Sequence, residues 1–133
     1  MKNQEINRNK LDKLSYEIIG CVIEVHKTLG VGLLESTYSS CLAYEFVEKG
    51  IYFEKEKELP IEYKGKIIDC GYRIDFLVEN EIILELKSVN NLLPIHHAQI
   101  LTYLRLADKR LGLLINFNEM IVKNGIIRVV NNF

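Results

Sequence analysis

Residues 72–90, YRIDFLVENEIILELKSVN, place three charged side chains inside two apolar runs that a short polar turn at 79–80 separates. Each run has the length and the β-branched content of a strand, and so short a turn makes the strands antiparallel neighbours. Charged groups seldom occupy such runs without a reason. The stretch therefore predicts a β-hairpin whose Asp75, Glu85 and Lys87 lie either at a solvated edge or in a catalytic site.

Helices are predicted on the N-terminal side of this hairpin. Apolar residues recur at helical spacing over residues 11–29, and Gly30 follows as a natural end of the helix. A second apolar stripe begins after a glycine turn and ends at Gly50. Residues 51–70 then alternate charged and apolar groups, which predicts an edge strand and a further hairpin.

The C-terminal part is predicted to hold one more helix and two closing strands. Pro94 suits a helix start, so we expect a helix over 95–108, and the strands follow in LGLLINF and GIIRVVNN. The expected fold is α/β, a mixed central β-sheet flanked by helices in the order α-α-β-β-β-α-β-β. We expect a single domain over 1–133, with 1–10 as a flexible N-terminus.

Composition narrows the class of protein. A chain of 133 residues with a net charge of −1 fits one globular domain and lacks the bulk basic character of a strongly non-specific duplex binder. Its three cysteines contain no CxxC pair, which argues against a zinc or iron–sulfur site. The N-terminus lacks a signal-peptide core and no run is long enough to span a membrane, so a cytoplasmic protein without a membrane partner is expected.

The two acids of the hairpin are expected to meet. Side chains alternate along a strand, so Glu85 and Lys87 share a face, and Asp75 on the neighbouring strand lies close to Glu85. Two adjacent carboxylates repel unless a cation lies between them, and such an oxygen-rich site suits Mg²⁺ or Mn²⁺. Lys87 would then orient a water nucleophile or stabilise charge that develops on a phosphate.

An aspartate on one strand followed by Glu-x-Lys on the next resembles the motif of the PD-(D/E)XK nuclease superfamily. Asp75, Glu85 and Lys87 match it, whereas Ile74 stands where many members have a proline. The resemblance implies a restriction-endonuclease-like core, two acids that bind metal, a catalytic lysine, and the carbonyl of Leu86 as a further ligand. It also implies a nucleic-acid substrate, with DNA favoured over RNA.

The helix expected after the hairpin carries a second similarity. Gln99 and Tyr103 lie four residues apart and hence on one helix face, with His96 on the same stripe. This arrangement is similar to the QxxxY motif of RecB-like nucleases, which implies that Gln99, Tyr103 and His96 contact the substrate. A half-buried tyrosine hydrogen-bonded to a glutamine is the alternative.

The stretch GLLESTY resembles the signature of the GxxExxY protein family, which is classed with the same superfamily. Gly32, Glu35 and Tyr38 supply the three named positions. The resemblance implies that Glu35 joins the catalytic and metal-binding acids, and we expect Tyr38, one turn further on, to line the substrate site. The alternative for Glu35 is a favourable interaction with the helix dipole, which needs no metal.

Together these motifs predict a Mg²⁺- or Mn²⁺-dependent nuclease that hydrolyses phosphodiester bonds. Two other functions stay open. A domain this small and without a basic groove would also suit a nucleic-acid-binding or assembly module that keeps the nuclease fold but cleaves weakly or not at all. Hydrolysis of a small phosphorylated substrate is the third candidate. A homodimer, or a partner protein that supplies the substrate, would compensate for the small surface.

Overall fold

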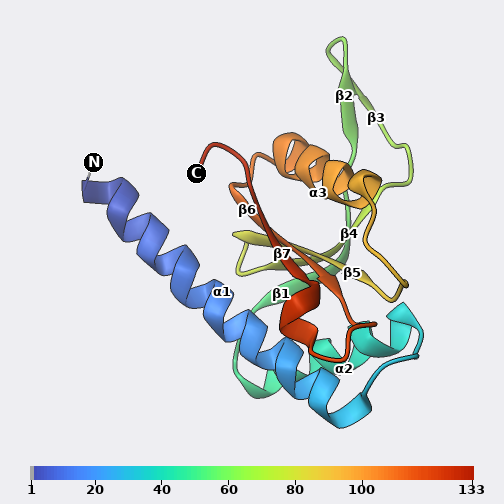
Figure 1. The fold of residues 1–133 in the computed structure, drawn as a ribbon. Helices are drawn as coiled ribbons and strands as arrows, with labels where there is room; N and C mark the ends of the chain where they lie inside the picture. The colour runs from blue at the N-terminus through green and yellow to red at the C-terminus, as the bar shows by residue number, and fades with distance from the viewer. Residues whose placement is uncertain (1) are drawn as a thin grey trace.

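The structure is a computed structural model that describes residues 2–133, with side-chain surroundings from residue 7 onward. Three α-helices, seven strands and a short 3-10 helix follow one another along this part of the chain (Figure 1). Their bounds are α1 Lys2–Leu29, α2 Glu35–Glu48, β1 Phe53–Glu58, β2 Ile61–Tyr63, β3 Lys66–Ile68, β4 Arg73–Val78, β5 Ile82–Lys87, α3 Pro94–Ala107, β6 Leu111–Asn116, η1 Val122–Gly125 and β7 Ile126–Val130.

Five strands form one mixed sheet in the order β1-β4-β5-β6-β7. Only β5 and β6 run parallel, and α3 is the crossover that connects them, while the other neighbours are antiparallel. Strands β2 and β3 form a separate hairpin that projects beyond α3 (Figure 1). The α/β fold with a mixed central sheet, expected from the sequence, is confirmed, and it is consistent with a restriction-endonuclease-like core.

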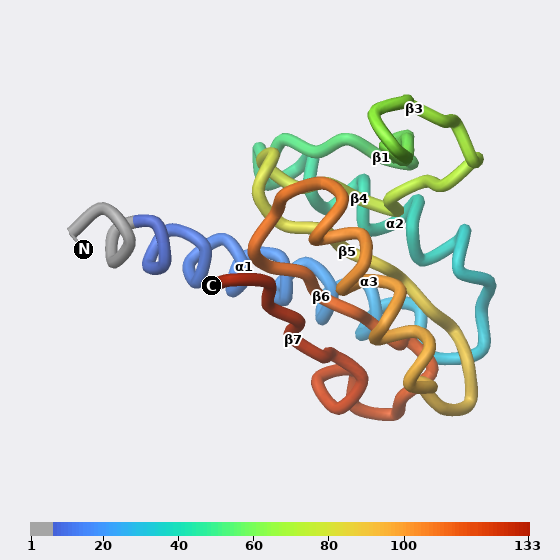
Figure 2. Tube along the Cα trace, turned by 90° about the horizontal axis from the view of Figure 1, so that it is seen from above, coloured from blue at the N-terminus to red at the C-terminus, as the bar shows by residue number. Residues whose placement is uncertain are grey.

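The helices cover opposite faces of this sheet. Helices α1 and α2 lie on one face and α3 lies on the other (Figures 1 and 2). The apolar runs of β5 and β6 lie between the layers, and their residues are buried almost without interruption. One core cluster fills the space under α1 and α2, and a smaller one lies under α3. The β5–β6 pair is therefore the centre of the fold, and Glu85 on it is buried.

Two expectations about the elements need correction. Helix α1 begins at Lys2, nine residues before the expected start at residue 11, so residues 2–10 are part of the helix. Residues 1–10 were expected to form a flexible N-terminus, and Met1 lies outside the described residues. The chain also forms five strands before α3 where the expected order had three, because β2 and β3 pair only with each other and leave β1, β4 and β5 in the central sheet. Within residues 2–133, no helix combines the length and the hydropathy needed to cross a bilayer.

A buried tyrosine fixes the turn between α1 and α2. Gly30 has a φ of +74°, a conformation that a residue without a Cβ adopts freely. The Tyr38 hydroxyl donates to the Gly30 carbonyl at 2.6 Å and accepts from the Leu33 N–H at 3.3 Å. Its ring stacks on Phe117 with centroids 4.3 Å apart. Tyr38 thus ties the glycine turn to the end of the central sheet.

We expect Tyr38→Phe to lower the free energy of unfolding by about 1–2 kcal/mol, because the variant leaves two backbone groups without their hydroxyl partner. Urea denaturation followed by circular dichroism measures the change. The matched control is Tyr44→Phe on the same helix, whose ring is 63% exposed and which should leave stability unchanged. Equal stability of both variants would contradict this role of the hydroxyl.

Candidate active site

The backbone pairing between β4 and β5 stops at Asp75 and Glu85, where the two strands diverge. Backbone pairing runs from Val78↔Ile82 to Phe76↔Leu84 and goes no further. Beyond it, the Asp75 N–H donates to Glu85 Oε2 at 3.0 Å, and the Leu86 N–H donates to Asp75 Oδ2 at 2.8 Å. Each carboxylate takes the place of a backbone acceptor across the opening. The expected proximity of Asp75 and Glu85 is therefore confirmed, and each acid is held by the other's strand.

Strand β4 loses its regular alternation at the same point. Ile74 and Leu77 both pack in the core cluster under α3, although residues three apart on a regular strand point to opposite faces. A regular strand would place Asp75 on the same face as Arg73 and Leu77. With Ile74 turned toward α3, Asp75 is free to line a cleft beside α2 instead.

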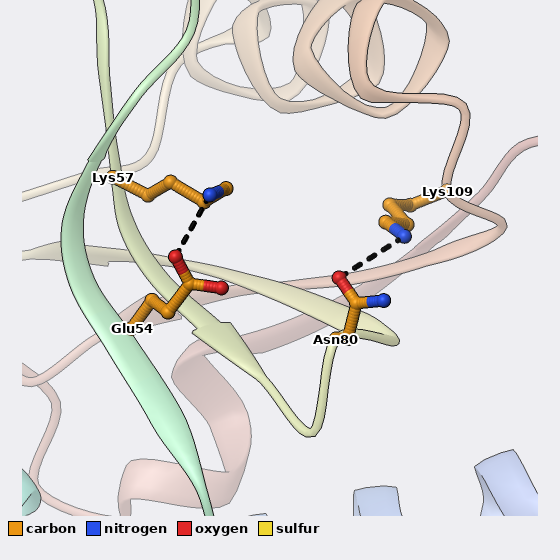
Figure 3. Close-up of polar contacts among 4 residues, drawn as sticks. All are labelled: Glu54, Lys57, Asn80 and Lys109. Carbon is orange, nitrogen blue, oxygen red and sulfur yellow. Dashed lines mark hydrogen bonds and ion pairs between the residues drawn. The ribbon is translucent and has the colours of Figure 1, made fainter.

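The neighbouring strand β1 shows a matching distortion. Its pairing with β4 omits Glu56, the residue that the register places opposite Asp75, and Glu56 has a φ of +54°. Glu54 and Lys57, three residues apart, consequently meet in an ion pair of 2.7 Å (Figure 3). At the other end of β4 the structure is regular, and the turn to β5 is held to the end of α3 by Lys109, which donates to Asn80 at 3.4 Å (Figure 3). The sheet is thus distorted locally, around Asp75.

Burial and the neighbouring acid dominate the electrostatics of the site. Glu85 is only 5% exposed. Desolvation, followed by repulsion from Asp75, raises the pKa of Glu85 from its usual value near 4.5 to about 9, and the Lys87 ammonium offsets this only in part. The Glu85 carboxyl therefore holds a proton at neutral pH unless a cation compensates the charge of the pair.

A cleft of about 230 Å³ opens beside the pair on the α2 side of the sheet. Asp75 and Leu86 lie on one wall, and Glu35, at the first turn of α2, lies on the other with Ser36 and Ser39. The oxygen donors of this cleft are hard ligands of the kind that Mg²⁺ and Mn²⁺ prefer, and these ions usually retain several waters. The donor set thus fits such an ion. Within residues 2–133, however, no three His, Cys, Asp or Glu side chains lie close enough together to form a complete metal site, so Glu35 stands apart from the pair.

On the opposite face of the sheet, α3 carries the polar residues His96, Gln99 and Tyr103. Tyr103 is 5% exposed and accepts a hydrogen bond from Gln99 Nε2 at 3.1 Å. Burial, and after it the charge of Glu85, raises the pKa of the Tyr103 hydroxyl. His96 Nδ1 accepts from the Leu93 N–H at 3.0 Å, so one of its ring nitrogens closes the N-terminus of α3. Gln99 and Tyr103 therefore lie on one face of α3 as a hydrogen-bonded pair, and their contact with a substrate stays a prediction.

These positions coincide with those of a known nuclease motif. A family model described as the PD-(D/E)XK nuclease superfamily matches residues 12–129. The chain belongs to this superfamily. A search of curated proteins and a search of solved structures each return no match. Asp75 and Glu85, which resemble the acids of the superfamily's motif, exchange hydrogen bonds where β4 and β5 diverge.

Tyr38 does not occupy the substrate-lining position that was expected of it. Its side chain is 0% exposed, its ring stacks on Phe117, and its hydroxyl is bound to the glycine turn. A substrate has no surface of this residue to contact. Of the three signature positions of GLLESTY, only Glu35 lines the cleft, while Tyr38 belongs to the packing of the fold.

The sequence reasoning missed Tyr72, which lies just before β4. Its ring is 45% exposed and approaches that of Tyr103 edge-on, with centroids 6.1 Å apart. The alternation of inward and outward side chains along β4 does not single out Tyr72, because that alternation is lost at Ile74 and Asp75. The local signal that was available is an aromatic residue three positions ahead of Asp75.

We expect Glu85→Gln to stabilise the metal-free protein at high pH and not at low pH. The folded pKa of Glu85 lies above its unfolded value, so its stability contribution is complete below pH 4.5 and is lost as pH rises toward 9. Glutamine keeps an acceptor for the Asp75 N–H and does not ionise. The free energy of unfolding of the variant relative to wild type should rise by about 1–3 kcal/mol between pH 4.5 and pH 8.5.

Urea denaturation in the presence of a chelator measures this difference. Glu48→Gln, at an exposed carboxylate of α2, is the control and should show no pH-dependent gain. A constant difference between Glu85→Gln and wild type across the pH range would mean that Glu85 ionises as it does in the unfolded chain.

Proposed function

We propose that the protein is a divalent-metal-dependent nuclease that hydrolyses phosphodiester bonds, with DNA as the expected substrate. The observation that carries the proposal is the pair of buried Glu85 and partly buried Asp75, held by reciprocal hydrogen bonds at the opening of β4 and β5. A protein gains no stability from a buried carboxylate beside a second one, because desolvation and mutual repulsion both oppose the ionisation of Glu85. Such a pair is better explained as a cation site than as part of the packing.

Asp75, Glu85 and the Leu86 carbonyl would hold the ion, with Glu35 completing the site from across the cleft. When bound, Mg²⁺ or Mn²⁺ supplies charge neutralisation at a phosphoryl oxygen and a lowered pKa for a coordinated water. The protein holds the two carboxylates in a fixed orientation. Each acid is bonded to the backbone of the neighbouring strand, so the two carboxylates are oriented before any ligand arrives.

Lys87 extends from the same strand two residues beyond Glu85 and is half-buried. Its ammonium lies close enough to Glu85 to lower the pKa of that carboxyl in part. At this place it would hold a water in line with the phosphorus or stabilise the charge that develops on the phosphate. Gln99 and Tyr103 would position the substrate strand from the α3 side.

We expect Lys87→Ala to abolish cleavage while Mn²⁺ binding persists, and Asp75→Ala and Glu85→Ala to lose both. The lysine acts on the reaction, whereas the two acids hold the ion. Calorimetric titration with Mn²⁺ measures binding, and cleavage of labelled single-stranded and duplex DNA measures turnover. A loss of at least a hundredfold in rate is expected for each of the three variants.

The control for these variants is Glu48→Ala, which removes an exposed carboxylate from α2 and should change neither binding nor cleavage. Retained cleavage by Lys87→Ala would refute its catalytic role. Nucleic-acid binding by the wild type without any metal-dependent turnover would instead favour the non-cleaving binding module.

Glu35 is expected to strengthen metal binding without being essential for it. Since Glu35 is exposed and lies on the far wall of the cleft, Glu35→Gln should weaken Mn²⁺ binding by about tenfold and leave the Asp75–Glu85 site able to bind. The same calorimetric titration measures the shift. An affinity equal to that of the wild type would assign Glu35 to the helix dipole of α2 alone.

A further inference from the structure

The two lysines of β1 lie on opposite faces of the sheet, although they are only two residues apart. On a regular strand, Lys55 and Lys57 would share a face. Residues directly opposite each other in an antiparallel pair do share one. Lys57 is paired with Ile74, which packs under α3, whereas Lys55 is paired with Phe76, which packs under α1 and α2. The alternation of β1 is therefore broken between its two lysines.

The break lies at Glu56 and is matched on the neighbouring strand at Asp75. Glu56 has a φ of +54°, and the register of β1 with β4 omits both residues. Irregularities of this kind in a sheet occur next to active sites, where they re-aim a side chain. Here Lys55 and Glu56 both line the cleft of about 230 Å³ that Asp75 lines from β4. The distortion thus places a lysine beside the aspartate of the candidate site.

Lys55 is the single cation among the described residues that line this cleft. Three other lining residues are carboxylates, which are Glu35, Glu56 and Asp75. Within the part of the chain whose side chains are described, no ion pair joins Lys55 to an acid. Lys57, by contrast, is bonded to Glu54 at 2.7 Å (Figure 3). The ammonium of Lys55 therefore stays available to an anion that enters the cleft.

The lysine of the Glu-x-Lys motif approaches the site from the other side of the sheet. On β5, Leu84 and Leu86 pack in the cluster under α1 and α2, whereas Ile83 packs under α3. Because Lys87 alternates with the two leucines, it extends on the α3 side. A phosphate in the cleft beside α2 consequently has Lys55 as its positive partner from the protein on that side.

We propose that Lys55 binds a phosphate of the substrate backbone in the cleft beside α2 and so positions the strand at the acids. The inference rests on the proposed nuclease function and adds a substrate-binding residue to it. A lysine ammonium forms charge-assisted hydrogen bonds with phosphate oxygens, and the three carboxylates of the cleft would otherwise repel the same phosphate. A contact of this type positions the nucleic acid and does not depend on its base sequence.

The test measures affinity for a labelled DNA oligonucleotide, single-stranded and as a duplex, by fluorescence anisotropy with Mn²⁺ in a Lys87→Ala background at several salt concentrations. Lys55→Gln should weaken binding roughly tenfold, because one charge-assisted hydrogen bond is lost. The slope of log affinity against log salt should become shallower by about 0.7 for the single strand and about 0.9 for the duplex, as expected when one phosphate contact is removed.

Two variants serve as controls for this measurement. Lys55→Arg keeps the positive charge and should bind as the parent does. Lys57→Gln removes a lysine from the same strand on the opposite face, where it is already paired with Glu54, and should leave the salt slope unchanged. Lys55 is exposed, so its replacement is expected to leave the fold intact.

A cleavage assay on the wild type keeps this inference apart from the proposed function. Metal-dependent cleavage, together with an unchanged affinity and salt slope of Lys55→Gln or an equal loss in Lys57→Gln, would overturn the phosphate contact and leave the nuclease intact. An affinity of the parent too weak to measure would also overturn the contact, whatever the wild type cleaves. A Lys55-dependent affinity in a protein that never cleaves would support the contact and refute the nuclease.

Discussion

The exchange of hydrogen bonds between Asp75 and Glu85 is the interaction on which the rest of the site depends. Two backbone N–H groups that a regular ladder would bond to carbonyls are bonded to carboxylates. The strands can therefore diverge inside the sheet without leaving buried donors unsatisfied, which would cost about 1–3 kcal/mol each. The opening places Asp75 at a cleft, and the pairing of β5 with β6 holds the strand that carries Glu85.

The divergence also connects the two faces of the sheet. Asp75 and Leu86 reach the cleft beside α2, whereas Glu85 influences Tyr103 under α3. A single layer of strands thus separates the polar, oxygen-rich cleft from a wider apolar groove that Tyr72 and Tyr103 line along α3. The chemistry expected on each side differs accordingly, because ions and phosphates suit the first and uncharged groups suit the second.

Much of the fold could be predicted from the sequence, because it depends on local patterns. The short turn before β5, the continuous apolar runs of β5 and β6 and the helical spacing of Gln99 and Tyr103 all act over a few residues. The break of alternation at Asp75 could not be predicted, since it arises from three strands acting together, with Glu56 in a left-handed conformation opposite the aspartate. The burial of Tyr38 depends on Phe117, 79 residues away, and no spacing rule reports such a contact.

The stacking of Tyr38 on Phe117 bears on how related chains should be interpreted. In the stretch GLLESTY, Gly32, with a φ of +90°, and Tyr38 maintain the turn between two helices, and of the three signature positions only Glu35 lines the cleft. Selection for folding alone would preserve two of the three signature positions, even in a chain that had lost its acids. A search that relies on this signature therefore recovers members of the fold, and the state of residues 75, 85 and 87 has to be inspected separately to distinguish enzymes from inactive descendants.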